Sequence, residues 1–359
     1  MERFRTYAML AKPVSSQCNF RCEYCYYQGK AAQLGQRKPI MSRDTLEQFV
    51  KQNIDMHGKE AVISFAWHGG EPLMAGLDFY RDALALQRQY GAGRQIQNSI
   101  QTNGALLNDD WCAFFRENQF EIGVSIDGPK ELHNTYRKRV DGTGTFDDTM
   151  RGIRLLQRQR IPFSALTTVN RVNMAAPLQV YEFLRELTDY IQFLPVVERL
   201  AAAPGALAPF SVTPEGYGSF LCAVWDAWKN RDAGKIHIQM FDVTSANLRG
   251  VASSLCVHHP VCGHSGSVEA NGDVYACDRF AFPGFKLGNL HEHPLSELME
   301  RNRPFGMHKA YGMDNGCFDC PYLKLCFGGC PKDRLDGKKN VLCADYRKFF
   351  SHVVGDGTR

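Results

Sequence analysis

The chain has 359 residues, of which 44% are hydrophobic and 22% charged, and its formal net charge is +4 at pH 7. This is an ordinary globular composition, and so mild a charge excludes the strongly basic surface expected of a nucleic-acid- or membrane-binding protein. Because no apolar run reaches membrane-spanning length and residues 1–17 lack the features of a signal peptide, the sequence predicts a cytoplasmic protein.

Strand-like and helix-like segments alternate from residue 7 to about residue 235. The expected strands are 7–13, 61–67, 96–102, 121–127, 161–169 and 190–197. Helices are expected between them, with start signals at Ser42, near Asn108 and at Thr213-Pro214-Glu215. This alternation predicts parallel βα units. Six units are too few for a complete eight-stranded barrel, so either an incomplete barrel or a doubly wound sheet is expected.

Unusual loops follow the first four predicted strands. They are the segment CNFRCEYC at 18–25 and the polar or glycine-rich segments 68–72, 101–104 and 125–129. Ligands of parallel α/β folds bind at the carboxyl ends of the strands, where these loops meet. The sequence therefore predicts a binding site at this rim.

The composition changes after about residue 248, where cysteine, glycine and proline become frequent. Residues 267–277 predict a hairpin, with Asn271-Gly272 as a type I′ turn. Short helices are expected beyond it, for instance near 294–301. A segment with so little apolar core is expected to need metal in order to fold.

Cysteine usage is the anomaly of the composition. Of thirteen cysteines, three lie at 18–25 and eight between 256 and 343. The remaining two, Cys112 and Cys222, fall in apolar helical patterns and are expected to be small buried hydrophobes. Clustered cysteines in a chain without an export signal favour metal ligands over disulfides.

The cysteines of the first loop, Cys18, Cys22 and Cys25, are separated by three and then two residues. A [4Fe–4S] cluster normally takes four cysteines, so three would leave one iron open to an outside ligand. A zinc site with a distant fourth ligand is the alternative. The eight downstream cysteines make two complete sets of four, suited to two fully ligated clusters or, alternatively, two zinc sites.

The first loop resembles the cluster motif of the radical S-adenosylmethionine (SAM) superfamily, and the downstream cysteines resemble the SPASM domain. The order of motifs further resembles the anaerobic sulfatase-maturating enzymes from about residue 10 to 343. The segments that carry this resemblance are KPVSSQCNFRCEYCYY, WHGGEPLM, SIQTNGALL, GVSIDGP, VEANGDVYACDRF, KLGNL and CFGGCPKDR.

The resemblance implies an α/β fold, namely a partial (β/α)6 TIM-like radical SAM barrel over 1–235 followed by a SPASM domain with a C-terminal helix over 236–359. It implies SAM and three [4Fe–4S] clusters as cofactors. The first cluster would be held by Cys18, Cys22 and Cys25. Auxiliary cluster I would be held by Cys256, Cys262, Cys277 and Cys330, and auxiliary cluster II by Cys317, Cys320, Cys326 and Cys343.

The resemblance also implies the residues around SAM and the substrate, although turn or surface roles are the alternative for each. The implied SAM-binding residues are Tyr24, Gly69, Gly70, Glu71, Gln101, Asn103, Ser125 and Arg137. Three further residues, His68, Tyr26 and Tyr27, are expected beside the substrate or else in the core. Relatives carry glutamine at the position of His68. Asp278 is the implied catalytic base; its alternative is capping a turn or pairing with Arg279 or Lys332.

The activity implied by the family is oxidation of a Cys or Ser in a sulfatase polypeptide to Cα-formylglycine, in a Cys/Ser-x-Pro/Ala-x-Arg type motif. A 5′-deoxyadenosyl radical would abstract the Cβ hydrogen. The expected partners are an unfolded or nascent sulfatase chain and a reductant such as flavodoxin or ferredoxin, with the enzyme a monomer. Two other hypotheses are a SPASM enzyme that crosslinks or modifies another ribosomal peptide, and a zinc- or cluster-bearing binding module without enzymatic activity.

Overall fold

The computed structural model describes residues 7–31, 40–200, 203–334, 337 and 339–355. Its central element is a ten-stranded sheet. In spatial order the strands are β12 (Lys286–Asn289), β11 (Asp273–Tyr275), β10 (Ser267–Val268), β1 (Met9–Ala11), β2 (Ile63–Trp67), β3 (Ile96–Thr102), β4 (Glu121–Ser125), β5 (Ser164–Val169), β6 (Tyr190–Pro195) and β9 (His237–Ile238). A separate two-stranded sheet pairs β7 (Arg199–Leu200) with β8 (Ala203–Leu207).

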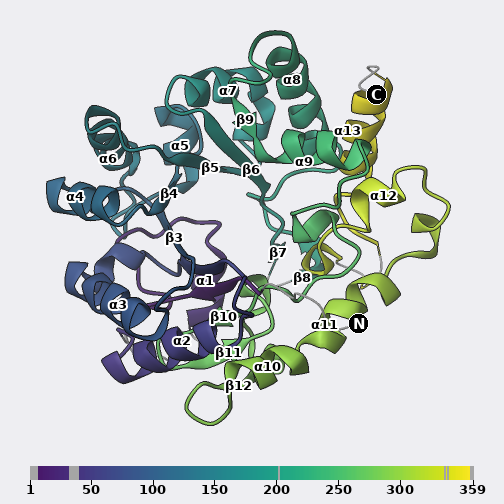
Figure 1. The fold of residues 1–359 in the computed structure, drawn as a ribbon. Helices are drawn as coiled ribbons and strands as arrows, with labels where there is room; N and C mark the ends of the chain where they lie inside the picture. The colour runs from purple at the N-terminus through teal and green to yellow at the C-terminus, as the bar shows by residue number, and fades with distance from the viewer. Residues whose placement is uncertain (1–6, 32–39, 201–202, 335–336, 338, 356–359) are drawn as a thin grey trace.

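Strands β1 to β6 and β9 are parallel to one another, which confirms the prediction of βα units. The helices of this part are α1 (Tyr26–Ala31), α2 (Arg43–Asp55), α3 (Leu77–Tyr90), α4 (Asp109–Glu117), α5 (Lys130–Tyr136), α6 (Phe146–Arg158), α7 (Pro177–Arg185), α8 (Gly216–Arg231) and α9 (Gln239–Leu248). Figure 1 shows helices α2 to α7 along the outer side of the sheet, so the sheet curves around an open centre as an incomplete barrel.

Two of the three predicted helix starts are confirmed. The side chain of Ser42 accepts a hydrogen bond from the Thr45 N–H, and that of Asn108 accepts one from the Trp111 N–H. The prediction of a cap at Thr213 is wrong, since α8 begins only at Gly216. Glu215 lies before it in the left-handed region, with φ of 64°, which breaks the helical path of Thr213-Pro214-Glu215.

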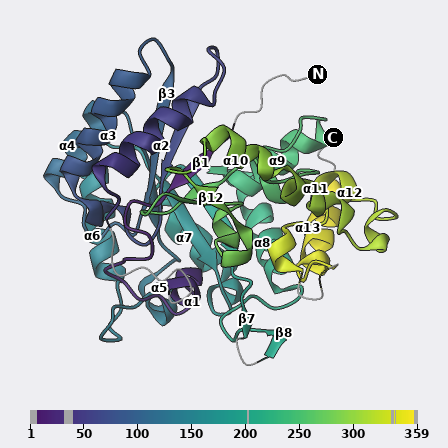
Figure 2. The same cartoon turned by 90° about the horizontal axis from the view of Figure 1, so that it is seen from below.

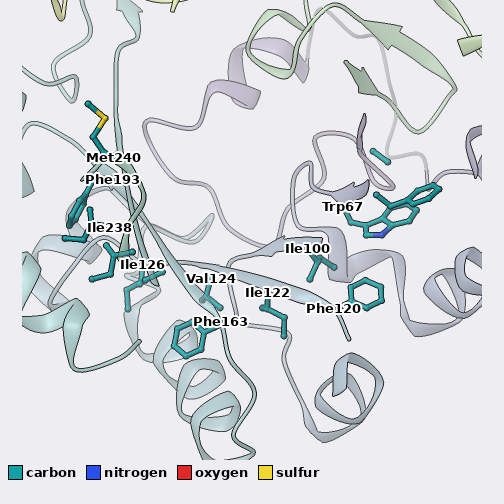
Figure 3. Packing of buried hydrophobic residues seen from close by; sticks show 14 of the residues in the cluster. Trp67, Ile100, Phe120, Ile122, Val124, Ile126, Phe163, Phe193, Ile238 and Met240 are labelled. Carbon is teal, nitrogen blue, oxygen red and sulfur yellow. The ribbon is translucent and has the colours of Figure 1, made fainter. Parts of the chain in front are cut away.

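The core lies between the sheet and the outer helices. Alternate strand residues point toward the helices, and Figure 3 shows Ile100, Ile122 and Val124 among them. Polar residues at the intervening positions, such as Gln101, face the open centre instead. Cys112 is fully buried in this core as predicted, whereas Cys222 is only partly buried at its margin.

The C-terminal region continues the same sheet. β10 pairs in parallel with β1, and β10, β11 and β12 follow one another as antiparallel strands. The predicted hairpin is therefore confirmed, but its turn is not type I′, since only Gly272 (φ 85°) and not Asn271 has positive φ. Instead, the Gly272 N–H donates to Glu269 O and closes a four-residue turn over 269–272. Gly272, the last residue of this turn, has the left-handed conformation.

The remaining helices are α10 (Leu295–Arg301), α11 (Arg303–Tyr311), α12 (Leu323–Cys326) and α13 (Cys343–Gly355). Figure 2 shows them gathered on the side of the molecule away from α3, α4 and α6. The predicted domains, 1–235 and 236–359, thus both contribute strands to one sheet. We propose that the boundary between them lies at residue 235. Across the described residues, no helix is both long and apolar enough to span a membrane.

Candidate active site

A cavity of about 460 Å³ lies where the carboxyl ends of β2 to β6 meet the C-terminal region. Its lining contains all but one of the residues predicted around SAM and the substrate, together with the three cysteines of the first loop. These residues are Cys18, Cys22, Tyr24, Cys25, Tyr26, Tyr27, His68, Gly69, Gly70, Gln101, Asn103, Ser125, Arg137 and Asp278. The exception is Glu71. Segments distant in the sequence therefore form one site.

The thiols of the three cysteines in the first loop are hard to deprotonate unless a positive charge lies nearby. Burial raises the pKa of the Cys18 thiol to about 12 and that of Cys22 to about 11, and it also raises the pKa of Cys25. The charges of neighbouring thiolates raise the pKa values of Cys18 and Cys22 further. Three thiolates here need a compensating positive centre, which the iron of a cluster would supply, so the residues fit such a group.

The glycine loop after β2 contacts, through its backbone, the segment that leads into the cysteine loop. The Gly70 N–H donates to Ser15 O at 2.7 Å, and the Glu71 N–H donates to Gln17 O at 2.7 Å. A Cβ on Gly70 would lie only 1.8 Å from Gln17 O. Glycine is thus required because the two loops pack backbone against backbone.

This contact predicts that Gly70→Ala displaces the cysteine loop. We expect a loss of stability of about 1–3 kcal/mol, typical of overpacking, and a lower iron content after anaerobic reconstitution. Thermal unfolding and iron analysis measure both effects. Gly58→Ala is the matched control, because a Cβ there would meet no atom within 4 Å. Equal iron content in the two variants would contradict the prediction.

Glu71 lies beneath the cavity and holds its wall. Its Oε1 accepts hydrogen bonds from the Leu73 N–H (3.1 Å) and the Thr102 hydroxyl (2.8 Å), and its Oε2 accepts one from the Asn103 N–H (2.7 Å). The side chain is fully buried, and this burial raises the pKa of its carboxyl to about 7. Glu71 therefore joins the loop after β2 to the end of β3, rather than reaching into the cavity as a SAM contact.

The other predicted SAM-binding residues lie along the ends of β3 and β4. The Gln101 side chain donates to Ser125 Oγ at 3.1 Å. Asn103 Nδ2 donates to Asn19 Oδ1 at 2.8 Å, and it lies 3.7 Å from Cys18 Sγ. These contacts place polar side chains next to the cysteine loop, where a chelating ligand of the open iron would lie.

Arg137 is held by a residue that the sequence did not single out, Asp127. Arg137 Nη2 lies 3.0 Å from Asp127 Oδ1, and Nε lies 3.0 Å from Oδ2. The Tyr24 hydroxyl donates to the same buried carboxylate. Arg137 thus lines the cavity with its orientation fixed by an ion pair. The signal for Asp127 was its place in the loop after the fourth predicted strand.

Asp278 projects into the cavity directly after Cys277. The Tyr26 hydroxyl donates to its Oδ2 at 2.8 Å, and the Lys12 ammonium forms an ion pair with its Oδ1. The expected alternative partners bind elsewhere: Arg279 pairs with Asp333, and Lys332 pairs with Glu198. Lys12 and Tyr26 therefore orient the Asp278 carboxylate.

The sequence did not single out Lys12 and Glu269 as site residues, and both are completely buried. Lys12 Nζ lies 3.7 Å from Glu269 Oε1 and 4.1 Å from the centre of the Tyr27 ring. The Tyr27 hydroxyl donates to Glu269 at 2.8 Å. A lysine at the end of the apolar strand β1 was the available signal, because lysine is rarely buried without a partner.

His68 lies at the end of β2 in the same cavity. Its Nδ1 accepts a hydrogen bond from the Gly69 N–H at 2.7 Å. Burial lowers the pKa of the His68 imidazole, which favours its neutral form, and the nearby Asp278 charge partly opposes this effect. Neutral imidazole has one donor and one acceptor, so with Nδ1 accepting, Nε2–H remains able to donate.

The eight downstream cysteines separate into the two predicted sets of four. Cys317, Cys320, Cys326 and Cys343 line a second cavity, of about 220 Å³. In the other set, burial raises the pKa of Cys262 to about 11 and that of Cys277 to about 12, and the charges of Cys256 and Cys330 raise both further, as expected of neighbouring thiols. Among the described residues, no three His, Cys, Asp or Glu side chains are arranged to hold a single metal ion.

Two family models match the chain. The radical SAM superfamily model covers residues 13–184, and the model of the SPASM iron–sulfur cluster-binding domain covers residues 261–321. The chain is accordingly a radical SAM enzyme, which needs SAM and a [4Fe–4S] cluster, with a SPASM domain that binds further iron–sulfur clusters. This agrees with the predicted fold class and cofactors.

Similarity to individual proteins extends over nearly the whole chain. A serine-type anaerobic sulfatase-maturating enzyme of Bacteroides thetaiotaomicron is 44% identical, over 96% of this chain and 89% of the relative. A cysteine-type enzyme of Clostridium perfringens is 32% identical, over 96% of both chains. The solved structure of native anSMEcpe with bound AdoMet and Cp18Cys peptide is 31% identical and superimposes with a TM-score of 0.88, over 97% of both chains. The chain therefore belongs to the anaerobic sulfatase-maturating enzymes.

Proposed function

We propose that this enzyme oxidises a serine or cysteine of a sulfatase polypeptide to Cα-formylglycine. The observation that carries the proposal is the position of Asp278, which a buried lysine and a tyrosine hydroxyl hold in the same cavity as the three-cysteine loop. The serine-type and cysteine-type names of the relatives support this substrate class. A peptide bound in the solved neighbour supports a polypeptide substrate.

The cysteines would hold the clusters as the sequence predicts, with the open site at Cys18, Cys22 and Cys25. SAM would lie against Tyr24, Gly69, Gly70, Gln101, Asn103, Ser125 and Arg137. When bound, the first cluster and SAM would supply the radical chemistry that removes the substrate Cβ hydrogen, and the auxiliary clusters would supply an electron acceptor.

The protein's own residues move the proton. Asp278 accepts it from the substrate hydroxyl or thiol, as a general base within the cavity. Lys12 and Tyr26 keep the carboxylate oriented throughout. His68 would donate from Nε2–H to the substrate backbone, and Tyr27, whose hydroxyl already donates to Glu269, would offer its ring. The proposed partners are an unfolded or nascent sulfatase and a reductant such as flavodoxin or ferredoxin.

A peptide assay tests the proposal. Anaerobically reconstituted enzyme, SAM and reductant are incubated with matched peptides carrying Ser-x-Pro-x-Arg or Cys-x-Pro-x-Arg. Mass spectrometry is expected to show loss of two hydrogens from the serine peptide, or exchange of the cysteine thiol and one hydrogen for a carbonyl oxygen. SAM cleavage that leaves both peptides unchanged would contradict the substrate assignment, and the alternative, modification of another ribosomal peptide, would then be favoured.

A further inference from the structure

Lys309, on α11, is completely buried, and its hydrogen-bond partners among the described residues are backbone oxygens. Its ammonium donates to the carbonyls of Cys256 (2.6 Å), Val257 (3.0 Å) and His259 (2.5 Å). All three donors of the ammonium are thereby used, on the segment that begins with the predicted ligand Cys256. Burial of a charge at this depth is costly unless an opposite charge lies nearby.

Lys309 lies near cysteines of both predicted auxiliary-cluster sets. Its ammonium interacts electrostatically with Cys256, Cys262 and Cys330 of the first set and with Cys326 of the second. The backbone of α11 also packs on the first set, because the Cys262 N–H donates to Gly306 O at 3.3 Å. A Cβ on Gly306 would lie 2.1 Å from Cys262 O, so this approach needs glycine.

A second buried cation, Arg334, stands beside Lys309. Its Nη2 donates to Lys309 O at 3.0 Å and its Nη1 to Gly312 O at 2.8 Å, while its buried Nε has no hydrogen-bond partner within the described part of the chain. The guanidinium interacts electrostatically with cysteines of both sets, including Cys330 and Cys317. Arg334 thus binds carbonyls at and just after the C-terminal end of α11 and keeps a second positive charge near both sets of cysteines.

Lys309 and Arg334 lack a carboxylate partner among the described residues. Within the part of the chain that the structure describes, neither Lys309 nor Arg334 forms an ion pair, whereas the neighbouring Arg279 is paired with Asp333. A [4Fe–4S] cluster held by four thiolates carries net negative charge and becomes more negative when reduced. Two such clusters would supply the counter-charge that these cations lack.

We propose that Lys309, with Arg334 beside it, is the fixed positive charge that stabilises the reduced state of the auxiliary clusters and so raises their reduction potentials. In the proposed reaction, the substrate radical loses one electron and an auxiliary cluster gains it, and a nearby positive charge favours this direction. The inference rests on the proposed assignment of the eight cysteines, which iron and sulfide analysis of the unaltered chain tests separately.

The test compares Lys309→Met, which removes the charge, with Lys309→Arg, which keeps it. Both are made in the full-length chain with Cys18, Cys22 and Cys25 changed to Ala, so that only auxiliary clusters give signals. Anaerobic redox titration followed by electron paramagnetic resonance gives the midpoint potentials. We expect Lys309→Met to lower at least one potential by about 59 mV, which is tenfold in a one-electron equilibrium constant, and Lys309→Arg to stay near the parent.

The matched control is Lys324→Met, because Lys324 is exposed and lies in α12 between two predicted ligands. Unchanged potentials in fully loaded Lys309→Met would overturn the proposal, and so would iron loss in both Lys309 variants, which would indicate a purely structural lysine. If only Lys309→Met loses iron, Arg334→Met is titrated instead. A lowered potential there supports the proposal, and an unchanged one overturns it.

Discussion

Asp278→Asn is expected to cleave SAM at a rate near that of the unaltered enzyme but to form at least about 100-fold less formylglycine, since general-base catalysis contributes about 10²–10⁴-fold. The substitution keeps the size of the side chain and removes its ability to accept the substrate proton. Asp278 lies outside the three-cysteine loop and the proposed SAM contacts, so radical generation should survive. The ratio of product to 5′-deoxyadenosine in one reaction measures this uncoupling.

Asp273→Asn is the control for this substitution. Asp273 lies in β11 of the same C-terminal hairpin and pairs with Lys286, outside the lining of the large cavity. It should keep the product ratio of the unaltered enzyme. Iron content is measured in both variants, because Asp278 neighbours the predicted ligand Cys277. Full product formation by a fully loaded Asp278→Asn enzyme would assign the base to another group.

The local pattern of the sequence predicted the repeating part of the fold well. The run 96–102 became β3 with the same bounds, and Ser42 and Asn108 cap helices because their side chains satisfy N–H groups of the first turn. The pairing of β10 with β1 was not predicted, nor was β9, which has only two residues. Such pairing depends on long-range contacts, and two residues carry no periodicity to read.

The site was predictable wherever one short motif carries its chemistry. The resemblance implied eleven cysteine ligands. Cys18, Cys22 and Cys25 line the large cavity and Cys317, Cys320, Cys326 and Cys343 line the second one, and the role of all eleven as ligands stays a prediction. The partners of Asp278 were harder to predict, because Lys12 is distant from it in the sequence and no local pattern indicates that the two residues pair. The partners expected from the sequence, Arg279 and Lys332, pair with Asp333 and Glu198 instead. These pairings depend on the three-dimensional fold and not on the local sequence.

Lys12→Met is expected to destabilise the folded enzyme by about 3–5 kcal/mol, the range found when one partner of a buried ion pair is removed. Lys12 is the cation between Asp278 and the completely buried Glu269. Without it, two carboxylates face each other at the seam between β1 and β10, and Asp278 loses one of the groups that orient it. The temperature of unfolding, measured under anaerobic conditions, and the product-to-5′-deoxyadenosine ratio should both fall.

Glu269→Gln combined with Lys12→Met separates charge from packing. The double variant removes one of the two carboxylates, and the Gln side-chain oxygen can still accept the hydrogen bond from Tyr27. If repulsion between carboxylates causes the instability, the double variant should unfold at a higher temperature than Lys12→Met alone. If the destabilising effects of the two substitutions simply add, the double variant should instead unfold at a lower temperature than Lys12→Met. Simple additivity would instead show that Lys12 acts by filling space. In that case its contact with Asp278 would matter for orientation but not for the balance of charge in the active site.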